Sequence, residues 1–440
     1  MKAYSSSLFR YALIFFFIGL FNIPQVSNAQ VPVSIYNRYQ SLATTLAQIT
    51  DKKDGQFNKE SEQKLIEKIK LFYQQQTTHS LERQLLASNL YLQALFMQQD
   101  YQQSYQVVAL LLTQALDQQQ QLTFQQLAGQ LAAQFKEPNN TTRWTIVEKH
   151  LTTWFSLFDQ LDEKQRANYK ITDQQQASNA ALLAQAFYLQ NKLNQALSPA
   201  KQAYALFPKE APYLKLVLAL LQGLEKHQEL NQHLKVAVMN FPHSEDYWHR
   251  LAYSYLSLDN NELALSTLAI TRNQGLLNTQ GYKVLGSLYL QQQQPRLAAE
   301  VYQEAAQKKF IEQDEYYYEM LLNAWLMARD RKQAIALLAQ AQKAGYQSNQ
   351  QAQQQAQLLY LEGHWKEAEL AYTSLLKNTE QDLTKRPLVE QKKDKLTTDK
   401  WRFLLAMSQI EQNKQAQATS NLMLLQTEQY KGYAASWLTQ

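Results

Sequence analysis

The chain has 440 residues, a formal net charge of +5 and no cysteine. The absence of cysteine excludes disulfide bonds, thiolate metal sites, a catalytic thiol and a lipid-acceptor residue, and the small net charge gives no reason to expect nucleic acid as a partner. Charged residues form only 18% of the chain, and glutamine runs take their place beside leucine, alanine and tyrosine. Because glutamine favours helices, this composition indicates helices with polar, mostly neutral surfaces.

Residues 1–29 have the pattern of a secretory signal peptide. Lys2 and Arg10 precede an uncharged run over residues 11–21. The segment ends in Ser27-Asn28-Ala29, which has small residues at the two positions that a signal peptidase recognises. The uncharged run is shorter than the roughly 20 residues that a transmembrane helix needs. We therefore expect cleavage after Ala29, export to the periplasm and no stable membrane span afterwards. An uncleaved membrane anchor is the alternative.

Residues 30–170 are predicted to form an irregular helical region related to the repeats that follow. Apolar residues recur at spacings of three and four, with short polar breaks between the segments. The expected helices cover residues 33–49, 61–75, 80–98, 101–116 and 122–135. A further helix starts near residue 141 and carries an aromatic face with Trp144, Trp154, Phe155 and Phe158. Core packing is the favoured role of these aromatics, ahead of a ligand site.

Residues 171–376 contain a repeat of 34 residues. The set Trp248, Leu251, Ala252, Tyr255 and Ala264 recurs as Tyr282, Leu285, Gly286, Tyr289 and Ala298. This period is typical of tetratricopeptide repeats, in which each unit is an antiparallel helix pair and large residues fill the gaps that alanine and glycine leave on the next helix. The windows begin near residues 177, 211, 245 and 279, and the register slips by two residues beyond Phe310. The predicted fold class is all-α, an α-solenoid of helix pairs.

The end of the array is less regular. Residues 377–400 are rich in charge and contain Pro387, so we predict a flexible charged loop there. Residues 401–440 have the pattern of a degenerate terminal helix pair followed by a cap over the end of the stack.

Signatures of catalysis are missing from the sequence. There is no glycine-rich phosphate loop, no Gly-x-Ser-x-Gly elbow and no His-Glu-x-x-His helix. His243, Glu245 and His249 form the tightest cluster of possible metal ligands, but a turn separates the first from the other two. Ser244 is expected to cap the helix that follows it. We predict a protein that is not an enzyme and holds no cofactor or metal.

A repeat array offers a groove in which a protein partner can lie. In tetratricopeptide folds the first helix of each pair lines the concave side. The positions between its packing residues are His249, Arg250, Tyr253, Lys283, Ser287, Tyr316, Glu319 and Asn323. Family members that bind chaperones hold a terminal carboxylate with lysine, asparagine and arginine on consecutive repeats. In this chain only Lys283 and Asn323 lie at positions that correspond to those carboxylate-binding residues, so the complete site is absent. The alternative for each of the eight residues is that it is ordinary solvated surface.

The C-terminal half resembles a known group of proteins. Segments Tyr318–Arg329, Tyr360–Ala368, Trp401–Ser408 and Tyr433–Leu438 are similar to those of periplasmic tetratricopeptide-repeat proteins encoded with TonB, ExbB and ExbD in marine gammaproteobacteria. The resemblance covers residues 170–440. It implies a scaffold that assists TonB-dependent energy transduction and outer-membrane iron-siderophore transport, with TonB, ExbB, ExbD or a TonB-dependent receptor as partner. It brings no catalytic residues.

Two other functions stay open. The first is a periplasmic adaptor in outer-membrane protein assembly, pilus formation or cell-wall biogenesis. The second, from a different class, is a hydrolase or glycan-binding protein with its site in the irregular N-terminal region.

Overall fold

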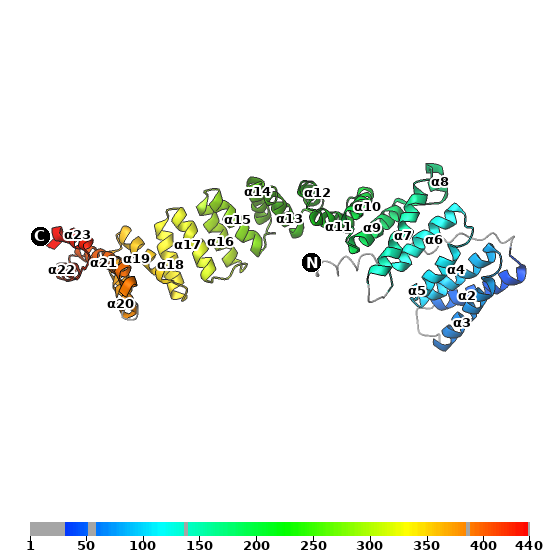
Figure 1. Cartoon of the computed structure of the whole chain (residues 1–440), viewed down its shortest axis with the longest axis horizontal. Coiled ribbons are helices and arrows are strands. Elements are labelled where there is room, and N and C mark those ends of the chain that lie inside the picture. The colour runs from blue at the N-terminus through cyan, green and yellow to red at the C-terminus, as the bar shows by residue number, and fades with distance from the viewer. Residues whose placement is uncertain (1–30, 52–58, 136–139, 384–387, 439–440) are drawn as a thin grey trace. The chain divides into compact units, whose positions relative to one another are not determined.

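The computed structural model describes residues 31–438 except 52–58, 136–139 and 384–387. The predicted signal peptide and its cleavage site after Ala29 lie outside the described residues and stay predictions. Within the described residues, every regular element is a helix (Figure 1). The predicted all-α class is confirmed. Among these residues, no helix combines the length and the hydropathy that a membrane span requires.

The chain divides into two compact units, with the division after Asn240. The helices of unit 1 are α2 (Val33–Asp51), α3 (Lys59–Gln76), α4 (Leu81–Met97), α5 (Tyr101–Leu111), α6 (Gln118–Ala132), α7 (Asn140–Phe158), α8 (Glu163–Asn168), α9 (Asp173–Leu189), α10 (Leu193–Leu206), α11 (Ala211–Gly223) and α12 (His227–Asn240). The predicted segments 33–49, 61–75 and 80–98 agree with α2, α3 and α4 within two residues. Helix α5 ends five residues before the predicted 101–116, and α6 lies three to four residues before the predicted 122–135.

The core of unit 1 contains the aromatic face predicted for residues 141–158. Trp144, Trp154 and Phe158 are buried, and the Trp154 and Phe158 rings stack with their centroids 5.0 Å apart. The core-packing role is confirmed for these three side chains.

The predicted boundary near residue 170 does not separate two packed regions. Trp144 and Val147 of α7 share one hydrophobic cluster with Leu183 and Ala186 of α9. Because the first regular pair uses the preceding helix as its packing partner, the solenoid continues across residue 170. The division of the chain into compact units falls instead at Asn240.

Unit 2 begins at Phe241 and consists of consecutive helix pairs followed by a terminal helix. Its helices are α13 (Glu245–Leu256), α14 (Asn261–Asn273), α15 (Thr279–Gln291), α16 (Pro295–Gln307), α17 (Glu315–Met327), α18 (Arg331–Lys343), α19 (Asn349–Leu361), α20 (Trp365–Leu383), α21 (Leu388–Ile410), α22 (Gln415–Met423) and α23 (Glu428–Leu438).

The helix starts follow the predicted repeat register. Helices α13, α15, α17 and α19 begin at residues 245, 279, 315 and 349, so successive starts are 34, 36 and 34 residues apart. The slip of two residues beyond Phe310 is therefore confirmed. The two extra residues lie in the connection between α16 and α17, where Ile311 turns its side chain into the core and is only 6% exposed.

Small residues let the paired helices approach closely. A Cβ atom added to Gly286 would lie 2.2 Å from Cε1 of Tyr302, well inside contact distance. Tyr302 lies on α16 and is 1% exposed, so its ring fills the space that the glycine leaves on α15. This pair is the large-small packing that the sequence repeat predicts.

From α9 to α22, each helix pair turns through one residue in the left-handed backbone region. These residues are Asn191, Glu225, Asp259, Gln293, Arg329, Gly363 and Asn413. In the α11–α12 turn, Glu225 has φ 54°, and the next backbone N–H, of Lys226, donates to the Leu221 carbonyl over 2.9 Å. This is the hydrogen bond of a Schellman helix ending, in which the left-handed residue satisfies carbonyls that the helix leaves unpaired.

The charged loop predicted for residues 377–400 is wrong wherever the structure describes the segment. Helix α20 continues to Leu383 and α21 starts at Leu388, and Pro387 falls among the residues that are not described. Lysine and glutamate are good helix formers, so charge alone does not break a helix. Leu376 of α20 and Trp401 of α21 belong to one hydrophobic cluster, which holds the two helices together.

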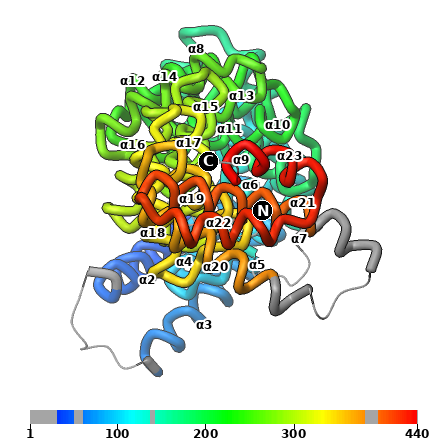
Figure 2. Tube along the Cα trace, turned by 90° about the vertical axis from the view of Figure 1, so that its left-hand side faces the viewer, coloured from blue at the N-terminus to red at the C-terminus, as the bar shows by residue number. Residues whose placement is uncertain are grey.

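The C-terminal end of unit 2 is a small cluster of three helices. Helices α21, α22 and α23 lie side by side (Figure 2) around Ala406, Leu422 and Ala434. Helix α23 covers the position at which the sequence predicts a terminal cap.

Candidate partner-binding surface

The eight residues predicted to line a groove lie on α13, α15 and α17, the first helices of three consecutive pairs in unit 2. Spacings of 34 and 36 residues place equivalent side chains in rows that cross these helices. One row contains Tyr253, Ser287 and Asn323, and the other contains His249, Lys283 and Glu319.

Four of these side chains are exposed on α15 and α17. They are Ser287, Tyr316, Glu319 and Asn323, and the Tyr316 side chain is 48% exposed. The ammonium Nζ of Lys283 lies 5.0 Å from the centroid of the Tyr316 ring, so a side chain of one pair contacts a side chain of the next. The attraction between a cation and an exposed aromatic ring stabilises such a contact by about 0.5–1 kcal/mol. The contact fixes one positive charge beside an accessible ring.

The residues beneath this surface are part of the packed core. The Ser287 hydroxyl donates to the Lys283 carbonyl over 3.0 Å and lies next to the phenol of Tyr302. Burial raises the pKa of Tyr302, and the Ser287 contact only partly opposes that effect. Tyr302 therefore stays a neutral phenol at physiological pH, and the charge on this surface comes from Lys283 and Glu319.

His249 does not line an accessible surface, contrary to its prediction. Its side chain is buried, and both ring nitrogens are engaged. Nδ1 lies 2.9 Å from the Glu245 carbonyl oxygen, and Nε2 accepts the backbone N–H of Asn278 over 3.3 Å. These roles fit a neutral ring protonated at Nδ1. Burial lowers the pKa of His249, which favours the same neutral form. His249 thus connects α13 to the turn before α15.

Arg250 and Tyr253 are partly buried on α13. A guanidinium nitrogen of Arg250 lies 3.8 Å from an Asp246 carboxylate oxygen. The Tyr253 ring stacks on the His249 ring at 6.3 Å, and its phenol oxygen is buried without a hydrogen-bond partner among the described residues. Burial raises the pKa of Tyr253. The accessible part of the predicted set is therefore concentrated on α15 and α17.

The start of α13 lacks the capping hydrogen bond that the sequence predicts for Ser244. Ser244 occupies the N-cap position and Glu245 and Asp246 lie in the first turn as expected, but the serine side chain makes no capping hydrogen bond. Because Glu245 accepts the side-chain N–H of Asn278 over 3.0 Å, this region serves helix packing. In the described part of the chain, no group of three histidine, aspartate or glutamate side chains is placed to hold a metal ion.

Sequence reasoning missed a polar joint between two helix pairs of unit 1. Glu148 of α7 receives an ion pair from Lys192 at 2.6 Å and a hydrogen bond from Gln190 at 2.8 Å. The same Gln190 amide donates to the Trp144 carbonyl over 3.2 Å. The left-handed residue Asn191 holds Gln190 and Lys192 on either side of the turn.

The same joint recurs in unit 2. Glu369 of α20 pairs with Lys414 at 2.6 Å and accepts from Gln412 at 3.0 Å, and Gln412 also donates to the Trp365 carbonyl over 3.1 Å. Burial acts to raise the pKa of Glu369, but these contacts outweigh it and leave the pKa lowered. The repeated Gln-Asn-Lys tripeptide at 190–192 and 412–414, each preceded by a Trp-x-x-x-Glu pattern, is the signal that identifies the joint.

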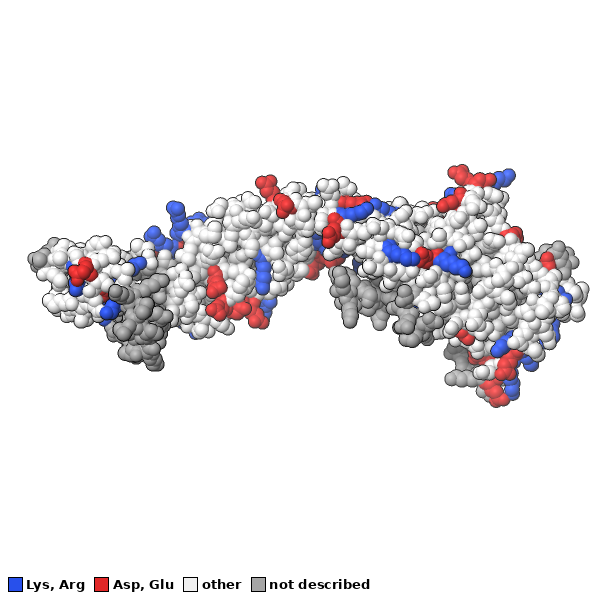
Figure 3. Space-filling view, in the orientation of Figure 1, with Lys and Arg blue, Asp and Glu red and all other residues white. Residues whose placement is uncertain are grey.

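The face shown in Figure 3 is mainly uncharged, with lysine, arginine, aspartate and glutamate in small separate groups. This agrees with the low content of charged residues, 18% of the chain. Such a surface supplies hydrogen-bonding amides and isolated charges, which suit recognition of a protein segment better than a large electrostatic patch would.

No family model and no curated protein matches this chain. Among solved structures, it is similar to a tetratricopeptide repeat protein from Parabacteroides merdae, with 12% identity over 66% of this chain and 99% of that one and a TM-score of 0.33. YrrB, described as a tetratricopeptide protein with an unusual peptide-binding site, shows 15% identity over 41% and 91% of the two chains and a TM-score of 0.32. PilF of Pseudomonas aeruginosa shows 13% identity over 47% and 92%, with a TM-score of 0.28. The repeat period and the antiparallel helix pairs themselves make this chain an α-solenoid of tetratricopeptide type.

Proposed function

We propose that this chain is an exported periplasmic adaptor that binds protein partners through the first-helix surface of unit 2 and assists TonB-dependent energy transduction. The observation that carries the binding role is the accessible set Lys283, Ser287, Tyr316, Glu319 and Asn323 on α15 and α17. Repeat arrays present such rows along an extended face, and they bind by contacts spread over several repeats.

The surface combines two features of protein-binding sites. Tyr316 offers a large apolar ring with a polar tip, which gains contact area at a low cost in conformational entropy. Lys283, already held over that ring, supplies a positive charge next to it. Glu319 and Asn323 add an acceptor of charge-assisted hydrogen bonds and a neutral amide on the same helix. A peptide or folded surface with an acidic and an apolar group fits this combination.

Support for the cellular role comes from the sequence. The predicted signal peptide implies export, and the resemblance over residues 170–440 implies the TonB, ExbB and ExbD system with its outer-membrane receptors. An adaptor that holds these partners together needs no catalytic group of its own.

The test is site-specific crosslinking in intact cells under iron limitation. A photoreactive amino acid at Asn323 should recover TonB, ExbB, ExbD or a TonB-dependent receptor, because this position lies on the exposed first-helix surface of α17. The same group at Gln340, exposed on the second helix α18 of that pair, should not recover them.

Recovery of the same partners from both positions would contradict the assignment of the surface. Recovery of none of these partners from Asn323 would contradict the TonB assignment. The Tyr316→Ala variant should reduce the crosslinking yield from Asn323 without lowering the helix content.

A further inference from the structure

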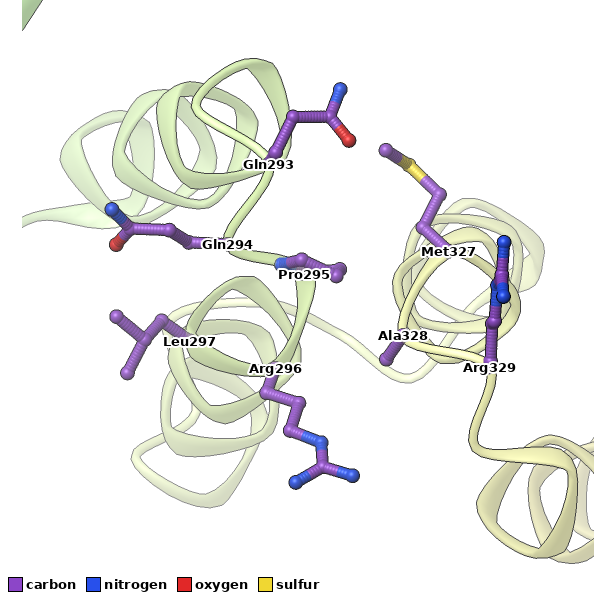
Figure 4. Close-up of a pocket in the computed structure, with 8 residues that line it drawn as sticks. All are labelled: Gln293, Gln294, Pro295, Arg296, Leu297, Met327, Ala328 and Arg329. Atoms are coloured by element: carbon purple, nitrogen blue, oxygen red, sulfur yellow. The ribbon is translucent and has the colours of Figure 1, made fainter.

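A second candidate site lies along the turns of unit 2, beyond the C-terminal ends of the first helices. A pocket of about 460 Å³ separates the α15–α16 turn from the C-terminal end of α17. In Figure 4, Pro295 and Ala328 project into the gap, Gln293 and Met327 face each other at one end, and Arg296 lies at the other. Arg329 runs beside Met327 at the rim. The pocket therefore has a small apolar floor, with Arg296 at one end and Arg329 at the outer rim.

The lining carries two positive charges and no acidic residue. Both arginines are exposed, and neither forms an ion pair with any residue that the structure describes. Glu300 follows Arg296 by one turn of α16 without an ion pair between them, and the Asp330 carboxylate accepts the Gln333 backbone N–H over 3.2 Å at the start of α18. Positive charge at this edge is therefore left for an outside group.

Other arginines at the pair boundaries of unit 2 are already neutralised. Arg272 pairs with Glu304 at 2.5 Å, and Arg331 pairs with Glu362 at 3.1 Å. Since the fold uses those arginines to join successive helix pairs, Arg296 and Arg329 differ from them in having no such structural partner.

The backbone on both sides of the pocket is fixed. Gln293 and Arg329 both have φ 56° in the left-handed turns. The residue after each donates back to the helix, Gln294 to the Tyr289 carbonyl over 2.8 Å and Asp330 to the Trp325 carbonyl over 3.0 Å. A site on preorganised turns loses little conformational freedom on binding, which favours affinity.

We propose that this pocket binds an acidic segment of a partner protein, with a carboxylate against Arg296 or Arg329 and a neighbouring aliphatic side chain between Pro295, Ala328 and Met327. Charge complementarity decides the class of occupant: two unpaired guanidinium groups favour carboxylates, and the apolar floor favours a residue such as leucine beside them. The site goes beyond the proposed function, because its charges come from Arg296 on α16 and Arg329 in a turn, and it shares no residue with the set that carries that function.

The test uses the full chain and a short fluorescein-labelled peptide in which glutamate and leucine alternate between glycine and serine spacers. Fluorescence anisotropy should show binding, and the peptide with glutamine in place of glutamate should bind about tenfold more weakly. The affinity of the double variant Arg296→Gln with Arg329→Asn for the acidic peptide should also fall about tenfold. Asparagine is chosen at position 329 because it tolerates the left-handed turn and carries no charge. Added salt should weaken wild-type binding.

The matched control is Lys343→Gln, which removes one exposed positive charge from α18 outside the pocket. This variant and Tyr316→Ala should bind the peptide as wild type does. Circular dichroism should show equal helix content in all variants. Equal binding of the glutamate and glutamine peptides, unchanged binding by the double variant or no binding of the acidic peptide at millimolar concentration would each overturn the proposal. Failure of Asn323 crosslinking would leave these results unaffected, so the two proposals fail separately.

Discussion

Buried histidines in unit 1 depend on their neutral form. The His150 side chain is only 5% exposed, and its ring nitrogens lie 2.7 Å from Oε1 of Gln125 and 3.2 Å from the Tyr105 hydroxyl. Gln125 Oε1 can only accept, so Nδ1 carries the proton and Nε2 accepts from Tyr105. Burial, with a smaller contribution from the Lys149 charge, lowers the pKa of His150 to about 4. A proton on Nε2 would force the Tyr105 hydroxyl to accept where it now donates, and would leave a charge in the core.

Acid should therefore destabilise unit 1 before its carboxylates titrate. The folded-state pKa of His150 is lower than that of the unfolded chain, so its stabilising effect is full above about pH 6.5 and is lost as pH falls towards about 4. Over that interval the free energy of unfolding should fall by about 3 kcal/mol. Urea denaturation between pH 7 and pH 4.5 measures the slope.

The control for this prediction is His150→Gln, which cannot titrate. It should be less stable at neutral pH but should flatten the pH dependence. Some slope should persist, because burial also lowers the pKa of His233 in α12. An unchanged slope in the glutamine variant would contradict the neutral-histidine account.

The left-handed turns are a second property of single residues. Glu225 has φ 54°, a conformation that is unfavourable for any residue with a Cβ atom, whereas glycine adopts it without a steric penalty. Glu225→Gly should therefore stabilise unit 1 by about 1 kcal/mol. Lys215→Gly, in the exposed interior of α11, should destabilise it by about 1 kcal/mol. If both substitutions shifted the urea midpoint equally, the left-handed conformation of Glu225 would not be a source of strain.

For single residues, the sequence predicted which positions line up along the surface, but it did not predict which of those side chains are accessible. Periodicity places His249 in the same row as Lys283, and the structure keeps them equivalent along the chain. The difference is that Asn278 and Glu245 enclose His249, and those contacts join residues about thirty positions apart. A helical period carries no information about such contacts, so the burial of this one ring could not be predicted.

At the scale of helices, α23 shows how little holds the C-terminal element. Ala434 is its one buried residue among those described. Asp399 of α21 is 1% exposed, and its Oδ2 accepts the backbone N–H of Gln426 at 2.9 Å, the N–H of Thr427 at 2.6 Å and the Thr427 hydroxyl at 2.7 Å. One carboxylate oxygen thus fixes the turn from which α23 starts.

Asp399→Ala should release α23 while the other pairs stay folded. The variant leaves two backbone N–H groups near the core without their acceptor, which costs about 1–3 kcal/mol each when such groups stay buried. Hydrogen exchange over residues 428–438 should become faster, with protection of α15 and α16 unchanged. Asp399→Asn keeps an acceptor oxygen and should have a smaller effect. Protection of α23 equal to wild type in the alanine variant would show that aromatic packing alone docks this helix.

Element boundaries were predictable where apolar spacing was regular and failed where the composition changed. Windows starting at residues 211, 245 and 279 coincide with the starts of α11, α13 and α15. The charged segment after residue 377 misled the prediction because charge alone does not stop a helix, and Lys377, Lys395 and Lys400 are exposed on α20 and α21. The contacts that define the pair come from Leu376 and Trp401 outside the segment. The chemical class of a residue does not reveal whether its neighbours anchor a helix.

For the whole molecule, the repeat architecture limits how far a local defect spreads. Each pair packs mainly on its neighbours in sequence, so stability is a sum of local terms and nearest-neighbour contacts. The period of 34 residues made this arrangement predictable. The division at Asn240 was not predictable, because the repeat pattern continues through it in the sequence.

Gly286→Leu tests this locality. The new side chain would collide with Tyr302, and overpacking of this kind typically costs about 1–3 kcal/mol. Hydrogen exchange should rise in α15, α16 and the adjoining pairs of unit 2 and stay at wild-type rates in α4 to α7. Gln291→Leu, at an exposed position of the same helix, is the matched control and should leave protection nearly unchanged. Faster exchange throughout unit 1 in the Gly286 variant would contradict nearest-neighbour coupling.

The left-handed turn residues also bear on how such a protein can change over generations. Glu225, Gln293 and Arg329 occupy equivalent turn positions, yet one is acidic, one neutral and one basic, and all three are exposed. Packing does not select the side chain there, whereas a change at Gly286 would meet Tyr302. A lineage can therefore replace the groups displayed along the turns at small cost in stability and acquire new partners while the helical framework stays the same.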